Sequence, residues 1–238
     1  MSDFFRFPHT PHIAWLGRGT PRDDKVLEPA EARSFLNAEI LVEEKVDGAN
    51  LGFSVSPEGE LRAQNRGHFL ERPFSGQFSR LEGWLSPRED AFFDALTGNL
   101  ILFGEWCAAR HSLAYDRLSD LFIAFDVYDR STGGFWSTRR RDELAAKLSL
   151  AVVPRIAHGR FTLEELVSRL STEHSSFRDE AVEGYYLRGE SELLLEDRAK
   201  LVRPEFTQAI GEHWSRRAIE WNRLAGDLHQ GPGYNAQI

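Results

Sequence analysis

The sequence predicts an α+β fold with mostly antiparallel sheets flanked by helices. Segments with a strand pattern outnumber those with a helical pattern, and the two types do not alternate strictly as in parallel α/β proteins. A hairpin supports the antiparallel arrangement, because residues 50–56 and 61–65 flank the turn Pro57-Glu58-Gly59. Neighbouring strands are therefore expected to run in opposite directions.

Hydrophobic periodicity predicts the other elements in chain order. A short helix is expected at 29–37, and the strand after it, at 39–45, ends in Lys45. Further strands are predicted where apolar and β-branched residues concentrate, at 99–106, 120–128, 181–188 and 192–203. Helical spacing predicts helices over 137–148 and 207–225.

Two short sequences have the form of a capping box, which marks the start of a helix. They are Ser86-Pro87-Arg88-Glu89, with proline at the first helical position, and Thr162-Leu163-Glu164-Glu165. A helix is expected to begin at each of them.

Length and composition favour one soluble globular core, or one domain with a small appendage. The chain has 238 residues, of which 41% are hydrophobic and 28% are charged. It has no apolar run of the roughly 20 residues that a membrane helix needs, and its N-terminus lacks the pattern of a signal peptide. Because Cys107 is the single cysteine, no internal disulfide is possible, and we expect a cytoplasmic protein.

The net charge of −8 argues against a surface coated for nucleic-acid binding, but it leaves room for a local basic groove. The arginines and lysines that lie close together in sequence are Arg62, Arg66, Arg72 and Arg80, and then Arg198, Lys200 and Arg203. For most of these residues a solvated surface of mixed charge is the simpler interpretation.

Charged residues interrupt the predicted strands at five places, although charged side chains are rarely buried unless they are paired or functional. They are Lys45, Glu105, Asp126, Glu183 and Lys200. Because each lies on a different strand, we expect them to converge on one polar pocket. Two lysines suit phosphate groups, and three carboxylates suit ribose hydroxyls and a divalent ion.

These residues lie in five motifs that resemble motifs I, III, IIIa, IV and V of the covalent nucleotidyltransferases. That superfamily comprises ATP-dependent DNA and RNA ligases and mRNA capping enzymes. The resemblance covers residues 40–206, in the order and at the spacing expected, and it rests on Lys45-Val46-Asp47-Gly48, Phe103-Gly104-Glu105-Trp106, Phe122-Ile123-Ala124-Phe125-Asp126, Glu183-Gly184-Tyr185-Tyr186 and Lys200-Leu201-Val202-Arg203. It implies a ligase-type nucleotidyltransferase (adenylyltransferase) domain over residues 1–206 and a short helical C-terminal extension over 207–238.

The resemblance also implies a role for each matching residue. Lys45 would be the adenylated nucleophile, and the main chain at Glu44 would contact adenine. Glu105 would hold the ribose hydroxyls, and Phe125 would stack on the base. The remaining roles are contact with the α-phosphate for Lys200, metal binding for Glu183 and Asp126, and nucleotide binding for Arg203.

Within the superfamily, the chain is most similar to the RNA ligase 2 type. Asn50 completes a Lys-x-x-Gly-x-Asn pattern, and Arg66 resembles an arginine that follows motif I in that type. Such an enzyme would use ATP and Mg²⁺ or Mn²⁺ to join 5′-phosphate and 3′-hydroxyl ends of RNA through a lysyl-AMP intermediate. Nicked or broken RNA and end-healing enzymes would be its partners. The alternatives are a DNA ligase core, a capping-type enzyme and a non-catalytic relative that binds nucleotides or RNA ends.

Elementary chemistry agrees with these roles. A lysine amine attacks phosphorus only when it is neutral, so its ordinary pKa of about 10.4 must fall, and a nearby cation lowers it. Charge that develops on the phosphate oxygens is stabilised by a second lysine and a metal ion. Strand parity places Phe125 on the face of Ile123 and Val127, opposite Asp126.

Two features depart from the superfamily pattern. The usual Lys-x-Lys spacing of motif V corresponds here to Arg198-Ala199-Lys200, whereas Arg203 follows one residue later than expected, so either arginine could be the second cation. Only about 32 residues follow Phe206, which is too few for the five-stranded OB-fold of DNA ligases and capping enzymes.

Three other segments have a structural and a functional interpretation. His9-Thr10-Pro11-His12 is expected to be a surface loop rather than a metal pair. Arg110-His111-Ser112 suits a capping or loop role, with a phosphate-binding loop as the alternative. Trp214 and Trp221 are expected to pack against the domain, with an RNA-stacking surface as the alternative.

Overall fold

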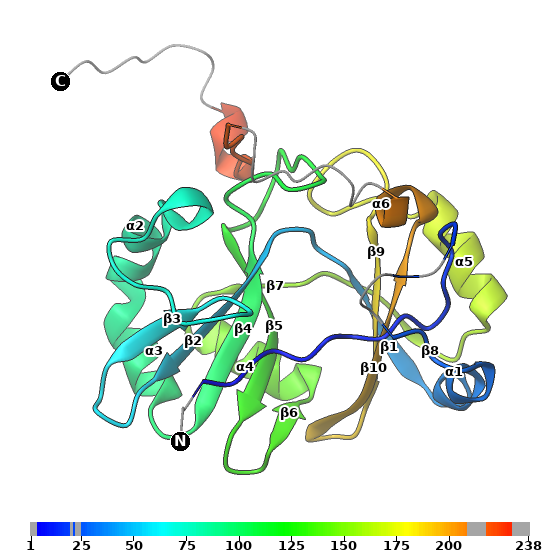
Figure 1. Ribbon diagram of the computed structural model, residues 1–238, viewed down its shortest axis with the longest axis horizontal. Helices are drawn as coiled ribbons and strands as arrows, with labels where there is room; N and C mark the ends of the chain where they lie inside the picture. Colours follow the sequence, from blue (N-terminus) through cyan, green and yellow to red (C-terminus); the bar gives the residue numbers. More distant parts are fainter. Residues whose placement is uncertain (1–3, 20, 22–24, 209–217, 230–238) are drawn as a thin grey trace.

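The computed structural model describes residues 4–19, 21, 25–208 and 218–229. The part it describes is an α+β fold built on one ten-stranded sheet, as the sequence predicts (Figure 1). Every neighbouring pair of strands is antiparallel except β7 with β5. The helices in this part of the chain are all too short or too polar to cross a membrane.

Strands far apart in sequence lie side by side in this sheet. In spatial order they are β3 (Leu61–Gln64), β2 (Ala49–Val55), β4 (Leu100–Trp106), β5 (Phe122–Asp129), β6 (Gly134–Trp136), β10 (Leu194–Val202), β9 (Gly184–Glu190), β1 (Ile40–Glu44) and β8 (Arg155–Gly159), with β7 (Ala151–Val152) paired to β5.

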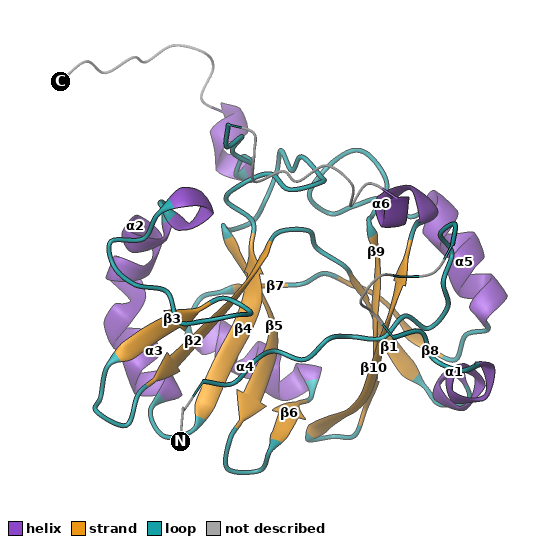
Figure 2. Cartoon of the chain, in the orientation of Figure 1, coloured by secondary structure: helices purple, strands orange, loops and turns teal. Residues whose placement is uncertain are grey.

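Two groups of helices cover the two halves of the sheet (Figure 2). One core lies between β2–β5 and the helices α2 (Leu81–Leu85), α3 (Glu89–Leu96) and α4 (Thr138–Lys147). The other lies between β1, β9 and β10 and the helices α1 (Pro29–Leu36) and α5 (Leu163–Thr172). The short β6 pairs with β10 and connects the halves.

One of the two predicted capping boxes is confirmed. The Thr162 hydroxyl accepts a hydrogen bond from the Glu165 backbone N–H at 3.2 Å, and the Glu165 carboxylate accepts one from the Thr162 N–H at 2.8 Å. The prediction for Ser86 is wrong. The chain reaches Ser86 already in helical conformation from α2 and passes through the 3₁₀ turn η2 (Ser86–Arg88), so α3 begins only at Glu89.

The prediction of a helix at 207–225 is also wrong for residues 218–224, which the structure describes. Helix α6 spans Pro204–Gln208, residues 209–217 with Trp214 lie outside the description, and a 3₁₀ turn, η5, spans Ala225–His229. Residues 218–224 are not helical, because their backbone groups pair with another part of the chain; for example, Asn222 N–H donates to the Ala108 carbonyl at 2.9 Å. Trp221 does pack against the first core, as predicted.

The N-terminal segment is not the surface loop expected around His9–His12. It runs beside β10, where Lys200 N–H donates to the Pro11 carbonyl and Ile13 N–H to the Lys200 carbonyl, both at 2.8 Å. Thr10 and His12 are consequently buried. The backbone pairing with β10 explains why Thr10 and His12 are buried, while His9 remains exposed.

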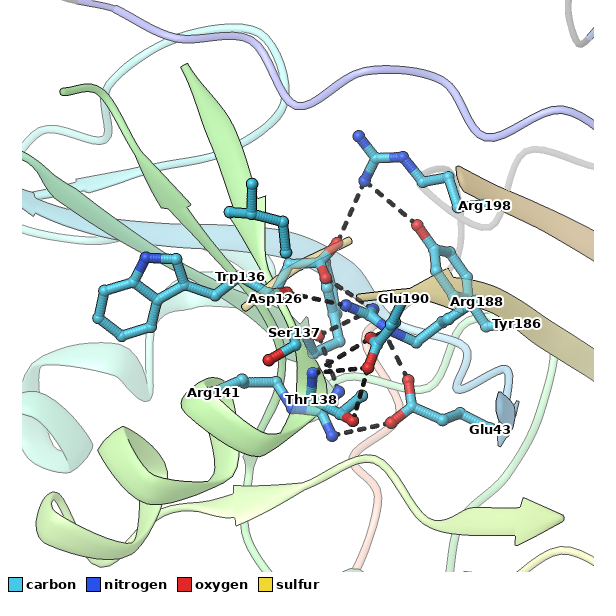
Figure 3. A network of polar contacts seen from close by, with 12 residues as sticks. Glu43, Asp126, Trp136, Ser137, Thr138, Arg141, Tyr186, Arg188, Glu190 and Arg198 are labelled. Atoms are coloured by element: carbon cyan, nitrogen blue, oxygen red, sulfur yellow. Dashed lines mark hydrogen bonds and ion pairs between the residues drawn. The ribbon is translucent and has the colours of Figure 1, made fainter. Parts of the chain in front are cut away.

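A buried ionic network joins the two halves of the sheet (Figure 3). Arg188 on β9 contacts Asp126 on β5 at 2.7 Å and Glu190 at 2.5 Å. Arg141 on α4 contacts Glu43 on β1 at 2.8 Å. Arg198 on β10 reaches the second oxygen of Asp126 at 3.2 Å. Three arginines thus balance three carboxylates, and Arg188 and Asp126 are each 0% exposed.

We predict that Arg188→Met will lower the free energy of unfolding by about 3–5 kcal/mol, because Asp126 and Glu190 would be left buried with unbalanced charge. Urea unfolding measures this change. Arg139→Met is the matched control: Arg139 makes an exposed ion pair with Glu192, so its loss should cost less than about 1 kcal/mol. Equal effects of the two variants would contradict the prediction.

Candidate active site

One open pocket collects side chains from both halves of the sheet. The space it encloses, counted together with the solvent at its open mouth, is about 710 Å³. It is lined by the predicted residues Glu44, Lys45, Asn50, Arg66, Glu105, Phe125 and Lys200, and by Phe7, Thr10, Glu43, Val46, Val153 and Tyr186, for which the sequence predicted no role in the site.

Lys45 follows β1 directly, and its backbone N–H donates to the Gly184 carbonyl at 2.9 Å. Its Nζ donates to both carboxylate oxygens of Glu183, each at 2.7 Å. Lys45 and Glu183, which are far apart in sequence, are thus brought into contact as the sequence predicts. The lysine side chain is held in one position by a two-point ion pair.

The carboxylates around Lys45 determine its protonation. Burial lowers the pKa of Lys45, but Glu183, Asp47 and Glu105 together outweigh burial and raise it. Burial also raises the pKa of Glu105, to about 8, although Lys45 and Arg66 oppose this. Without a ligand the amine is therefore protonated, and Glu105 is largely protonated at pH 7.

Two motif glycines allow the strands to approach this closely. A Cβ at Gly184 would lie 2.3 Å from the Leu201 carbonyl oxygen on β10. A Cβ at Gly48 would lie 2.6 Å from the Trp106 carbonyl oxygen on β4. Both contacts are with backbone, which cannot move aside, so glycine is required where β9 and the segment after Lys45 meet their neighbours.

Aromatic rings form one wall of the pocket. Phe125 lies at a bulge in β5, because Phe103 pairs with Asp126 and Gly104 with Ala124, which leaves Phe125 without a partner. Phe7 meets the Phe125 ring edge-to-face at 5.2 Å. Tyr186 lines the pocket as well, and its hydroxyl hydrogen-bonds with Thr10 at 3.2 Å. Flat apolar rings of this kind suit a nucleobase.

Asn50 brings an unsatisfied acceptor to the pocket. It lies on β2 opposite Glu105 on β4. Its buried Oδ1 has no hydrogen-bond partner within the protein, which is uncommon for a buried polar atom. A ligand that donates a hydrogen bond would satisfy it.

Three predicted site residues do not line this pocket, namely Glu183, Asp126 and Arg203. Glu183 reaches it only through its contact with Lys45. Both oxygens of Asp126 are bound by Arg188 and Arg198 in the ionic network. Arg203 donates to the Leu170 carbonyl at 3.3 Å and to Glu205 at 3.5 Å. Arg198, the other candidate for the second cation, contacts Asp126 and Tyr186. Of the cations in this segment, Lys200 alone lines the pocket.

The pocket could supply only part of a metal ion's ligands. Within the described ranges, no group of three or more His, Cys, Asp or Glu side chains is arranged to hold an ion. Glu183 and Glu105 both lie close enough to Lys45 to affect its pKa. This fits Mg²⁺ or Mn²⁺ bound by one or two carboxylates together with substrate phosphates.

We predict that Glu105 makes the protein less stable as pH rises from about 5 to 8. Its folded-state pKa of about 8 lies above the ordinary glutamate value of 4.5, so ionisation is harder in the folded than in the unfolded chain. Glu105→Gln removes this effect, so its stability relative to wild type should increase over that range. Urea unfolding at several pH values measures it, with the exposed Glu60→Gln as control; parallel curves for Glu105→Gln and wild type would contradict the prediction.

Comparison with known proteins identifies the family. A family model for RNA ligase matches residues 38–202, more than half of the chain. No curated protein sequence matches it. A Naegleria gruberi RNA ligase mutant, solved with ATP and Mn, aligns with a TM-score of 0.64 at 15% identity, covering 87% of this chain and 59% of that chain.

A second solved structure, assigned as an ATP-dependent DNA ligase from Aquifex aeolicus, aligns with a TM-score of 0.55 at 21% identity, covering 84% of this chain and 50% of that one. The chain therefore spans only half to three fifths of the length of these proteins, and at such identities the likeness shows the fold, that of a ligase nucleotidyltransferase domain. The match over residues 38–202 shows more: the chain belongs to the RNA ligase family.

Proposed function

We propose that this protein is an ATP-dependent RNA ligase that joins 5′-phosphate and 3′-hydroxyl ends through a covalent lysyl-AMP intermediate. The observation that carries the proposal is the position of Lys45, which lies in the pocket with Lys200, Glu105 and Phe125 and is held by Glu183. A lysine, a second cation, a ribose-binding carboxylate and an aromatic ring together match the parts of ATP.

In the first step, the neutral amine of Lys45 attacks the α-phosphorus of ATP. The bond to pyrophosphate breaks and a phosphoramidate to AMP forms. Lys200 stabilises the negative charge on the α-phosphate. Phe125 and Tyr186 hold the base, the main chain at Glu44 contacts adenine, and Glu105 accepts hydrogen bonds from the ribose.

Lys45 must lose its proton before it can attack. In the ligand-free protein the Glu183 contact favours the charged amine, so Glu183 must be drawn away when the substrate binds. Glu183 would hold a divalent ion together with the substrate phosphates, and the ion would supply positive charge that neutralises those phosphates. The same ion contact would lower the pKa of Lys45.

In the next two steps, AMP passes from Lys45 to the 5′-phosphate of the nucleic acid, and a 3′-hydroxyl then displaces AMP. RNA with nicks or breaks is the proposed substrate, and enzymes that repair the ends are proposed partners. A cytoplasmic location agrees with the single, buried and unpaired Cys107. The Naegleria gruberi RNA ligase solved with ATP and Mn supports these assignments by its fold.

A DNA ligase is the second candidate, because the Aquifex aeolicus protein aligns over 84% of this chain. Sealing assays separate the two candidates when they compare nicked duplexes that differ only in whether the strand with the 3′-hydroxyl is RNA or DNA. An RNA ligase should seal the RNA strand faster, and a DNA ligase the DNA strand. Competition between ATP and GTP in covalent labelling tests the capping-type alternative.

We expect wild-type protein to become covalently labelled when it is incubated with α-labelled ATP and Mg²⁺ or Mn²⁺, and Lys45→Ala to remain unlabelled, since the variant has no amine to attack. Gel autoradiography measures the adduct. Lys147→Ala, which removes an exposed lysine at the end of α4, is the matched control and should label normally. An unlabelled wild type, or equal labelling of Lys45→Ala, would disprove the proposal.

We also expect the rate of labelling to rise with pH between about 6 and 9. The carboxylates around Lys45 raise its pKa, so the reactive neutral amine is scarce at low pH and becomes more abundant as pH rises. While the amine is mostly protonated, the rate should increase roughly tenfold per pH unit. Single-turnover measurements at ATP concentrations well below half-saturation test this, because they report the ionisation of the ligand-free enzyme, and a rate independent of pH would be the contrary result.

A further inference from the structure

The C-terminal strap, which we define as residues 218–225, lies against the loop at 107–121 that connects β4 and β5 (Figure 1). Ala109 pairs with Trp221, and Leu118 pairs with Leu224. The strap lies beyond residue 202, where the match to the RNA ligase family ends. The family pattern therefore assigns it no role.

Asn222 makes the central contacts between strap and loop. The residue is buried, with only 5% of its surface exposed. The Oδ1 atom accepts a hydrogen bond from Tyr115 N–H at 2.9 Å, and Nδ2 donates to the carbonyls of Cys107 at 2.8 Å and Ala109 at 3.3 Å. One amide group thus fixes the start and the middle of the loop.

The loop in turn fixes the segment that carries Lys45. The Tyr115 hydroxyl accepts a hydrogen bond from Asp47 N–H at 2.9 Å. The Asp47 carboxylate accepts two more, from the backbone N–H groups of Ser112 at 2.7 Å and Leu113 at 2.9 Å. Asp47 is only two residues from Lys45, so the loop constrains the backbone on one side of the lysine.

Apolar packing follows the same path. Val46 and Tyr115 are buried in one cluster, and Leu224 of the strap packs against it. Trp221 packs on the neighbouring core, with the Arg80 guanidinium 4.1 Å from its ring centre. The strap, the loop and the residues beside Lys45 are therefore packed against one another without a break.

We propose that Asn222 is a positioning residue for Lys45, acting through Tyr115 and Asp47. The inference rests on the proposed function, in which Lys45 is the nucleophile. Loss of Asn222 would release the loop and displace Lys45 from the line of attack. A displacement of about 1 Å can lower a rate by about 100-fold without contact between the altered residue and the substrate.

The test compares Asn222→Ala and Tyr115→Phe with wild type in single-turnover labelling by α-labelled ATP. The maximal rate should fall about 10- to 100-fold in Asn222→Ala, with little change in the ATP concentration at half-maximal rate. Tyr115→Phe, which keeps the ring and removes one oxygen, should lower the rate in the same way. The double variant should lose no more than the more impaired single variant, because both act along one path.

A stability control separates positioning from general damage. Leu166→Ala creates a cavity in the core of the other half of the sheet, so it should lower the melting temperature while the maximal rate stays unchanged. Amide hydrogen exchange of residues 45–49 gives a readout that needs no activity, and exchange there should be faster in Asn222→Ala and Tyr115→Phe than in Leu166→Ala.

Each result decides one question. Normal labelling rates and unchanged exchange in Tyr115→Phe and Asn222→Ala would overturn the positioning role but leave the proposed function intact. Rate losses that multiply in the double variant would also overturn it. Absence of label on wild type would refute the proposed function, and the exchange measurement would still decide whether Asn222 positions the segment around Lys45.

Discussion

The buried pairing of Arg188 with Asp126 and Glu190 is the interaction on which the rest of the structure depends. It lies where the two halves of the sheet meet, and Arg141, Glu43 and Arg198 extend it to three other elements. Hydrophobic packing alone would let two such halves slide, because apolar contact has no direction. Hydrogen-bonded charges have fixed geometry, so they set how one half faces the other. The pocket residues come from both halves, so their relative positions depend on how the two halves face each other.

The network also shapes the pocket directly. Arg141 donates to the Phe125 carbonyl at 2.9 Å, which holds the β5 bulge where the ring faces the pocket. Arg198 donates to the Tyr186 hydroxyl at 3.3 Å, and Glu43 contributes to both the network and the pocket wall. The polar network thus helps to fix two of the aromatic rings that line the pocket, Phe125 and Tyr186.

The antiparallel α+β fold could be predicted because the alternation of apolar residues marks each strand. Most candidate site residues could be predicted because they are charged residues on those strands. Lys45, Glu105 and Lys200 could be found because each interrupts a buried strand. Asp126 also interrupts a buried strand, but its carboxylate is bound by Arg188 and Arg198 in the buried ionic network. The strand pattern could not predict this, because it does not show which cation lies beside a buried carboxylate. The positions of Glu43 and Tyr186 in the pocket lining were not predicted. The residues around them in the sequence do not show which side of the strand faces the pocket. The strap resembled a helix in its spacing, and only its distant pairing with residues 108–118 shows otherwise.

The two-point contact between Lys45 and Glu183 has a consequence for the life of the protein between reactions. Free lysine amines are attacked slowly by sugars, aldehydes and carbon dioxide, and a site lysine made permanently neutral would be modified first. Here the charged ammonium is held between carboxylate oxygens at 2.7 Å and has no lone pair to offer. The ion pair with Glu183 therefore keeps this amine protonated and unreactive toward such reagents, which protects a side chain that the cell can replace only by making a new chain.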